Sequence, residues 1–174
     1  MPIDYVVGDA TAPQDPGNKI IVHCCNNVGA WGAGFVMALS ARWSKPEEYY
    51  RWWATRDLDG YHYNPFELGQ VQYVQVESTF EPGIGSKLEH IWVANLIGQN
   101  GTRSFKNPRP VDYGAISKGL KDVAEKAVSV GASVHMPRIG CGLAGGDWNV
   151  VEYIIEHSML FFYPDLSITV YDLE

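Results

Sequence analysis

A nearly continuous apolar segment at residues 19–26 (KIIVHCCN) constrains the fold of this chain more than any other feature. A strand that is apolar at successive positions must be buried on both faces, as happens inside a parallel sheet that helices cover on both sides. Further strand patterns occupy residues 4–9, 68–76, 89–98, 132–139 and 167–173. Helix patterns lie between several of them, at residues 32–43, 45–56, 112–131 and 147–160. This alternation predicts a layered α/β domain.

The length and composition fit one globular domain that spans residues 1–174. With 46% hydrophobic and 19% charged residues, the chain is too apolar for a disordered protein. No apolar run is long enough to cross a membrane, and the first residues do not resemble a signal peptide. Three cysteines, two of them adjacent, favour a reducing compartment over a disulfide framework. We therefore expect a cytoplasmic monomer that contacts no membrane.

The net charge of −7 restricts the partners of the chain. Lys and Arg total 13 and are scattered, so we expect no extended surface for nucleic acid. If the protein binds phosphate groups, backbone amides must make many of the contacts. No spacing of His, Cys or Asp indicates a metal site, and no cofactor is expected.

Three unusual stretches follow predicted strands, namely GDA at 8–10, NNVGAWGAG at 26–34 and GCGLAGGD at 140–147. Glycine is costly in ordered structure and is used where φ is positive or where a ligand comes close to the backbone. A glycine-rich turn before a helix also exposes amides that hold anions. Because ligands gather at the carboxyl ends of parallel strands, the three stretches predict one cleft with two anion-binding loops.

These stretches resemble the motifs of the macro domain (macrodomain) family. The resemblance covers nearly the whole chain and is carried by VVGDAT (6–11), IIVHCCNNVGAWGAGFVMALSARW (20–43), MPRIGCGLAGGDW (136–148) and ITVYDL (168–173). The chain looks most similar to the small ADP-ribose-1″-phosphate processing type, and more distantly to the terminal ADP-ribose glycohydrolase type. The resemblance implies a three-layer α/β/α macro domain with a mixed sheet of about six strands. It also implies ADP-ribose or a derivative as the ligand.

The resemblance implies that Asp9 accepts a hydrogen bond from the adenine amino group of the ligand, and that the backbone amide of Ala10 lies beside it. An ordinary turn or helix-cap aspartate is the alternative. The distal ribose and the diphosphate are assigned to a loop that contains Asn26, Asn27, Gly29, Ala30, Trp31, Gly32 and Gly34. The diphosphate is also assigned to the backbone amides of Gly140, Cys141, Gly142, Leu143 and Ala144. Trp31 is either a wall over the ribose or a core residue.

Two residues are candidate catalytic groups. His23 lies inside the apolar segment, which is typical of a core histidine, but the related phosphatases have a histidine at the matching place. A neutral imidazole near the distal ribose would act as an acid or base near pH 7. Asp147 precedes the last predicted helix, where it either caps the helix or positions a water molecule beside the ribose.

Two departures from the glycohydrolase type argue against its mechanism here. That type relies on a lysine after the fourth strand and on an aspartate just after GCGL, where this chain has Gln99 and Ala144. Gln99 cannot form a lysyl adduct, and Ala144 cannot transfer a proton. A cysteine phosphatase is also disfavoured, since no arginine stands at the sixth position after any cysteine.

The expected function is hydrolysis at the distal ribose, above all of ADP-ribose-1″-phosphate to ADP-ribose and phosphate. Two alternatives stay open. One is an ADP-ribosyl hydrolase that removes ADP-ribose from protein or nucleic acid, and the other is a non-catalytic ADP-ribose-binding sensor. The leaving group projects beyond the predicted contacts, so the sequence does not identify it.

Overall fold

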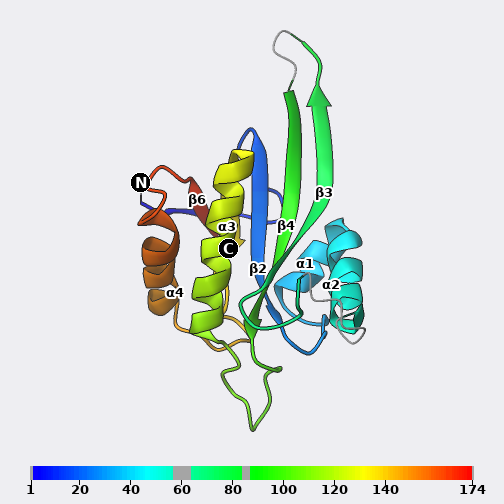
Figure 1. The fold of residues 1–174 in the computed structure, drawn as a ribbon, viewed down its shortest axis with the longest axis vertical. Coiled ribbons are helices and arrows are strands. Elements are labelled where there is room, and N and C mark those ends of the chain that lie inside the picture. Colours follow the sequence, from blue (N-terminus) through cyan, green and yellow to red (C-terminus); the bar gives the residue numbers. More distant parts are fainter. Residues whose placement is uncertain (1, 57–63, 84–86, 174) are drawn as a thin grey trace.

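The computed structural model describes residues 2–56, 64–83 and 87–173, and a six-stranded sheet runs through its centre (Figure 1). The strand order is β1-β6-β5-β2-β4-β3. The strands are β1 Asp4–Val7, β2 Asn18–Asn26, β3 Val71–Glu81, β4 Lys87–Gln99, β5 Ala132–Pro137 and β6 Ile168–Asp172. All neighbouring pairs are parallel except β3 and β4, which are antiparallel, so the sheet is mixed as predicted.

The apolar segment forms the central strand β2, between β4 and β5. Ile20, Ile21 and Val22 have no exposed surface. Ile20 and Val22 belong to one hydrophobic cluster, while Ile21 belongs to a second cluster on the opposite face. The prediction of a strand buried on both faces is confirmed.

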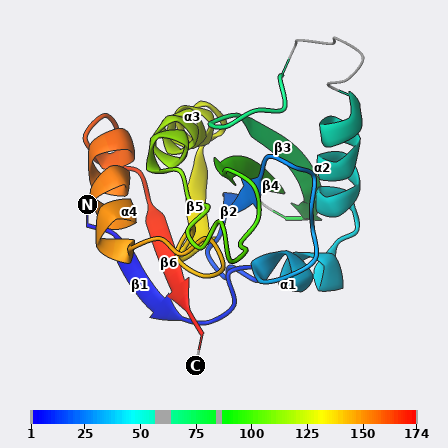
Figure 2. The same ribbon diagram turned by 90° about the horizontal axis from the view of Figure 1, so that it is seen from below.

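Helices cover both faces of the sheet (Figure 2). α3 Tyr113–Val130 and α4 Trp148–Ile155 pack on one face, and α1 Phe35–Arg42 and α2 Lys45–Arg56 pack on the other. The three-layer α/β/α architecture is therefore confirmed. Among the described helices, none has both the length and the apolar character needed to cross a membrane.

Several predicted boundaries are wrong for local reasons. The helix predicted at 32–43 begins at Phe35, because Gly34 has a φ of 83° that no helix tolerates. The helix predicted at 147–160 ends as a π-helical turn at Glu156–Leu160, where Phe161 N donates to Glu156 O at 2.8 Å. The strand predicted at 68–76 starts at Val71 and continues to Glu81, because β3 and β4 pair beyond the rest of the sheet as a projecting arm (Figure 1).

The helix α3 lies directly on β4 at Gly119. A Cβ at Gly119 would lie only 2.4 Å from Cγ of Leu96, a side chain with no exposed surface. Gly114, one turn earlier in α3, has no atom closer than 3.4 Å to the corresponding position. A substitution at Gly119 therefore changes the packing of α3 on β4, whereas the same substitution at Gly114 changes only the helix propensity.

We predict that Gly119→Ala lowers the free energy of unfolding by about 1–3 kcal/mol, because the added methyl group overpacks the α3–β4 contact. Gly114→Ala is the matched control, and we expect a change between zero and a gain of about 1 kcal/mol from helix propensity. Urea denaturation of the two variants measures both values. Equal stability of the two variants would contradict the packing argument.

Candidate functional site

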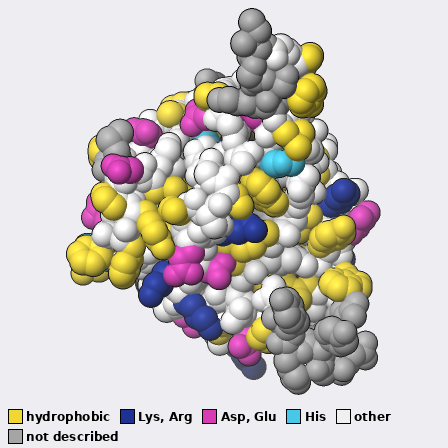
Figure 3. All heavy atoms as spheres, turned by 45° about the horizontal axis from the view of Figure 1, so that its top comes forward, with side chains coloured by type: hydrophobic (Ala, Val, Ile, Leu, Met, Phe, Trp, Pro, Cys, Tyr) yellow, Lys and Arg dark blue, Asp and Glu magenta, His cyan; other side chains and the backbone are white. Residues whose placement is uncertain are grey.

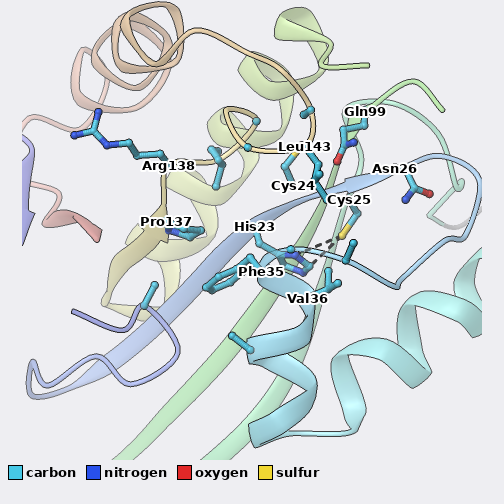
Figure 4. Close-up of a pocket in the computed structure, with 18 of the residues that line it drawn as sticks. His23, Cys24, Cys25, Asn26, Phe35, Val36, Gln99, Pro137, Arg138 and Leu143 are labelled. Atoms are coloured by element: carbon cyan, nitrogen blue, oxygen red, sulfur yellow. Dashed lines mark hydrogen bonds between the residues drawn. The ribbon is translucent and has the colours of Figure 1, made fainter. Parts of the chain in front are cut away.

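A cavity of about 750 Å³ opens at the carboxyl ends of the strands (Figure 4). It is lined by segments that follow β1, β2, β4 and β5 and by the first turn of α1. The stretches at 8–10, 26–34 and 140–147 all contribute to the lining, so the predicted convergence is found. The volume lies in the range of sites that hold a small molecule or a cofactor.

The Asn26 side chain shapes the first loop of the cavity. Its Oδ1 accepts hydrogen bonds from the amides of Val28 and Ala30, both at 3.1 Å, and from the Tyr50 hydroxyl at 2.8 Å. Its Nδ2 donates to Ala30 O at 2.8 Å. Most of the hydrogen-bonding capacity of Asn26 is therefore used inside the protein, although the residue borders the cavity.

The start of α1 presents backbone amides to the cavity. Gly34 is the N-cap residue, and no side chain caps this end of the helix. Phe35 and Val36, the first helical residues, line the cavity (Figure 4). The first amides of a helix have no partner within the helix and carry a partial positive charge. This end of α1 is therefore suited to an anionic ligand.

The second glycine-rich loop, at residues 140–147, is closed by its own hydrogen bonds and contains another set of amides that have no acceptor among the described residues. Gly146 N donates to Gly140 O at 2.7 Å, and a Cβ at Gly146 would lie 2.4 Å from that oxygen. Gly140 has a φ of 73°. Within the described ranges, the amides of the three residues at 142–144 donate to no protein atom. All three residues line the cavity, so their amides form a second place where an anion can bind.

Asp9 lines the cavity after β1, which β6 and β5 separate from β2 and from the loop at 26–31 that follows it. Its Oδ1 accepts from the Thr11 amide at 2.8 Å and from the Thr11 hydroxyl at 2.7 Å. Its Oδ2 lies 3.9 Å from Nη2 of Arg42. The hydrogen bond from Thr11 lowers the pKa of Asp9, so the group is a carboxylate at neutral pH. The predicted turn role is present, and Oδ2 is the oxygen that remains for a ligand.

His23 is buried in the cavity floor and is only 2% exposed. Its Nε2 lies 2.5 Å from Oδ1 of Asn95. Asn95 Nδ2 itself donates to Pro46 O and Gln72 Oε1, so Nε2 of His23 is the donor. Nδ1 lies 3.8 Å from Sγ of Cys25 (Figure 4). Burial lowers the pKa of His23 to about 4, which keeps the ring neutral at pH 7.

The cysteines of the site are protonated thiols at neutral pH. Burial raises the pKa of Cys24 to about 12, and it raises the pKa of Cys25 well above its ordinary value. Burial also raises the pKa of Cys141 to about 11. A thiol with such a pKa is a poor nucleophile, which agrees with the absence of a suitably spaced arginine in the sequence. No group of three or more metal-ligating side chains exists among the described residues.

The lining includes most of the predicted site residues. Those that border the cavity are Asp9, Ala10, His23, Asn26, Ala30, Trp31, Gly32, Gly34, Gly140, Gly142, Leu143 and Ala144. Trp31 is also a core residue, 5% exposed, whose indole NH donates to Oγ of Ser40.

Four predicted residues support the loops and do not line the cavity. Asn27 joins its loop to the segment after β4, through bonds to Asn100 and Gly101. Gly29 adopts a φ of 80°, a backbone conformation that favours glycine, within the same loop. Cys141 points its thiol at Ile139 O. Asp147 accepts from the Asn149 amide at 2.9 Å and caps α4, which confirms its helix-cap interpretation.

Several lining residues were not predicted as site residues. Thr102 and Arg103 lie in a polar segment without periodicity, and Tyr171 lies in the last strand. Arg138 also borders the cavity, but its side chain turns away from it and forms two hydrogen bonds with Asp172 (Figure 4). The cation next to a predicted anion-binding loop therefore holds β5 to β6.

A macrodomain protein from Streptomyces coelicolor is 47% identical to this chain, with a TM-score of 0.76. The similarity covers 98% of each of the two chains. The chain belongs to the macrodomain family. No protein-family profile matches it.

Three further relatives differ more in sequence, and two of them are much longer than the macrodomain. A Thermosipho africanus DarTG structure, solved in complex with ADP-ribose, is 17% identical with a TM-score of 0.65, over 90% of this chain and 38% of the other. The zebrafish protein named chromodomain-helicase-DNA-binding protein 1-like is 33% identical over 155 residues, and the macrodomain spans 14% of its length. An ADP-ribose 1″-phosphate phosphatase from Meyerozyma guilliermondii is 20% identical, over 91% of this chain and 95% of that protein.

The macrodomain contains a second buried histidine, His135, so the effect of histidine burial on stability can be measured at two positions. His135 has no exposed surface, and its Nδ1 lies 2.7 Å from the Tyr171 hydroxyl oxygen. Burial lowers its pKa to about 4, as it does for His23. The folded chain therefore keeps both rings neutral over a pH range in which the unfolded chain protonates them, so stability is lost as pH falls below about 6.5 toward about 4.

Between pH 7.5 and pH 5, each buried histidine lowers the unfolding free energy of the wild type by about 2 kcal/mol. We predict that His23→Gln and His135→Gln each abolish one of these two contributions. Each variant is less stable than the wild type at pH 7.5, because hydrogen bonds inside the protein are lost. Urea denaturation at several pH values gives the measurement. His157→Gln, at an exposed histidine, is the control. A pH dependence identical to wild type in both buried variants would contradict the lowered pKa values.

Proposed function

We propose that the macrodomain binds ADP-ribose in the cavity of about 750 Å³. The observation that carries the proposal is the pair of amide sets that face one space, at the start of α1 and at residues 142–144. A diphosphate between them receives hydrogen bonds without any nearby lysine, which fits the net charge of −7. The Thermosipho structure with bound ADP-ribose supports the choice of ligand.

The two ends of the cavity fix the direction of the ligand. A carboxylate oxygen accepts a hydrogen bond from an exocyclic amine, so the adenine amino group binds Oδ2 of Asp9. The distal ribose then lies toward the loop that Asn26 holds, close to Gln99 and the buried His23 (Figure 4). The Leu143 side chain, 3.5 Å from the Cβ position at Gly34, connects the two glycine-rich loops beside the diphosphate.

The proposed reaction is hydrolysis of the bond between the distal ribose and its substituent, with ADP-ribose-1″-phosphate as the leading substrate. The phosphatase from Meyerozyma supports this choice, since its similarity covers 95% of that protein. The neutral His23 and the protonated thiols offer no strong base or nucleophile in the cavity floor. Rate acceleration therefore comes from holding the ribose in a fixed pose and from oriented amides that stabilise developing negative charge.

A substrate panel tests the proposed reaction. Wild-type protein is incubated with ADP-ribose-1″-phosphate, an ADP-ribosylated protein and an ADP-ribosylated oligonucleotide, and the released product is quantified by chromatography. Slow release of phosphate from the first substrate is the expected result. Binding of ADP-ribose without turnover of any substrate would show that the protein is a sensor.

Gly142→Val and Gly32→Val fill the proposed site without disturbing the fold. A Cβ at either position meets no atom within 4 Å, and neither residue has a positive φ. Both residues line the cavity. We predict that each variant binds ADP-ribose at least about tenfold more weakly in calorimetry, because the side chain blocks approach to the amides. The melting temperature stays at the wild-type value. Unchanged affinity in both variants would rule out this binding site.

Asp9→Asn tests the direction of the ligand. Asparagine keeps an oxygen for the Thr11 turn but replaces the second oxygen by a donor, which cannot accept from the adenine amine. We predict that affinity for ADP-ribose falls by about 10- to 100-fold, in line with the loss of a hydrogen bond to a charged group. Affinity for ribose-5-phosphate, which has no adenine, is unchanged. A weaker affinity for both ligands would mean that Asp9 only shapes the loop.

A further inference from the structure

The segment after β4 carries an unusual set of exposed side chains. Residues 100–109, which we call the rim loop, contain Arg103, Lys106 and Arg109 and no acidic residue. Phe105 is fully exposed, at 101% of its reference area. Single exposed apolar residues are common on proteins. The combination of a fully exposed aromatic ring with three cations is the feature that requires an explanation.

The rim loop is held in one shape by its own hydrogen bonds. The Asn107 side chain donates to Asn100 O at 2.9 Å and to Thr102 O at 3.2 Å. Ser104 and Asn107 exchange backbone hydrogen bonds at 3.0 and 3.1 Å. Phe105 therefore lies on a closed turn that presents its ring to solvent, with little ordering entropy to lose when a ligand binds.

The rim loop projects beyond the end of β4 (Figure 1) and borders the cavity. Asn27 bonds to Asn100 and Gly101, which joins the rim loop to the first loop of the site. At its other end, the rim loop packs on Gly145, where a Cβ would lie 3.1 Å from Cγ of Arg109. Thr102 and Arg103 line the cavity itself. The rim loop thus lies beside the proposed place of the distal ribose, away from Asp9.

The rim loop carries its cations without carboxylates beside them. Other cations of the chain are paired, among them Arg51 with Glu47 and Arg138 with Asp172. On the face drawn in Figure 3, cationic and anionic side chains are interspersed. Over the part of the chain that is described, no carboxylate lies within ion-pair distance of the three rim-loop cations. The cations remain available to an external anion.

We propose that the rim loop binds a short segment of single-stranded nucleic acid, with Phe105 stacked on a base and the three cations next to phosphates. An aromatic ring and neighbouring cations are the combination that holds single strands without reading their sequence. An acidic peptide would satisfy the cations but would offer no flat ring to Phe105. Three contacts suit a few nucleotides, so the rim loop is compatible with the lack of an extended basic surface.

The rim loop adds a second substrate class to the proposed function, beside ADP-ribose-1″-phosphate. A strand held there would present an attached ADP-ribosyl group to the cavity, with its distal ribose next to the strand. This second step rests on the proposed binding of ADP-ribose, whereas strand binding by the rim loop does not. The two steps can therefore fail separately.

Fluorescence anisotropy with a labelled single-stranded 12-nucleotide DNA tests the rim loop. We expect wild-type binding to weaken by about 20-fold between 50 and 200 mM salt, the change for about three phosphate contacts. Phe105→Ala weakens binding by about 5- to 100-fold through loss of stacking. Lys106→Glu weakens binding and makes the salt dependence shallower. The matched controls Phe161→Ala, 74% exposed at the end of the π-helical turn after α4, and Lys121→Glu on α3 bind as the wild type does.

Calorimetry with ADP-ribose separates this proposal from the proposed function. Phe105 and Lys106 do not line the cavity, so both rim-loop variants keep wild-type affinity for ADP-ribose. Equal strand affinity of the rim-loop variants and their controls would overturn the proposal. Equal competition by polyglutamate would overturn it in favour of an acidic peptide. Strand binding without ADP-ribose binding would leave the rim-loop site standing and refute the proposed function.

A strand that carries an ADP-ribosyl group tests the connection between the two sites. We expect the wild type to bind the modified strand at least tenfold more tightly than the unmodified strand, since two linked contacts act together. Gly142→Val removes only this gain, and Phe105→Ala weakens both strands. No gain in the wild type would show that the rim loop does not direct an attached group into the cavity.

Discussion

The site depends on the hydrogen bonds of one side chain, the carboxamide of Asn26. Its oxygen accepts from two amides of the following loop and from the hydroxyl of Tyr50, a fully buried residue of α2. These bonds turn the chain sharply at the end of β2 and lead it past Trp31 to the start of α1. A buried amide leaves almost no room for alternatives, because any unsatisfied donor or acceptor there is costly. The loop therefore keeps its shape without a ligand, and the uncapped end of α1 stays directed at the cavity.

Backbone amides suit an acidic protein that binds an anion. A lysine at the proposed diphosphate position would be attracted to the many carboxylates of a chain with net charge −7, whereas an amide has no net charge and forms no ion pair with them. Both glycine-rich loops offer amides instead of cationic side chains. The nearby Arg138 shows how a cation is diverted, because it bonds to Asp172 and packs its guanidinium over the rings of Tyr5 and Trp148. The rim loop, in contrast, presents three cations that form no ion pair within the described residues.

The fold was predictable because periodicity reports burial directly. The buried strand β2 and the amphipathic α3, which Asp112 caps at one end and Gly131 ends with a φ of 64°, were both visible in the sequence. The convergence of three stretches on one cavity followed from topology alone. The roles of polar residues were harder to predict, since Asn26 and Asp147 bond to backbone groups two to four residues away. A ligand contact and a local turn use the same residue types, and only the three-dimensional arrangement separates them.

The cavity has a different electrostatic character along its length. Asp9 makes one end anionic, the amides of α1 and of residues 142–144 make the middle weakly positive, and Arg103 of the rim loop borders the other end. The floor between them is neutral, because burial keeps His23 uncharged and the thiols protonated. A ligand with an amine at one end and phosphates further along can lie in only one direction in such a field. Orientation is therefore built into the fold by charges and dipoles at the two rims, while the neutral floor allows a close approach of the sugar without a competing ion pair.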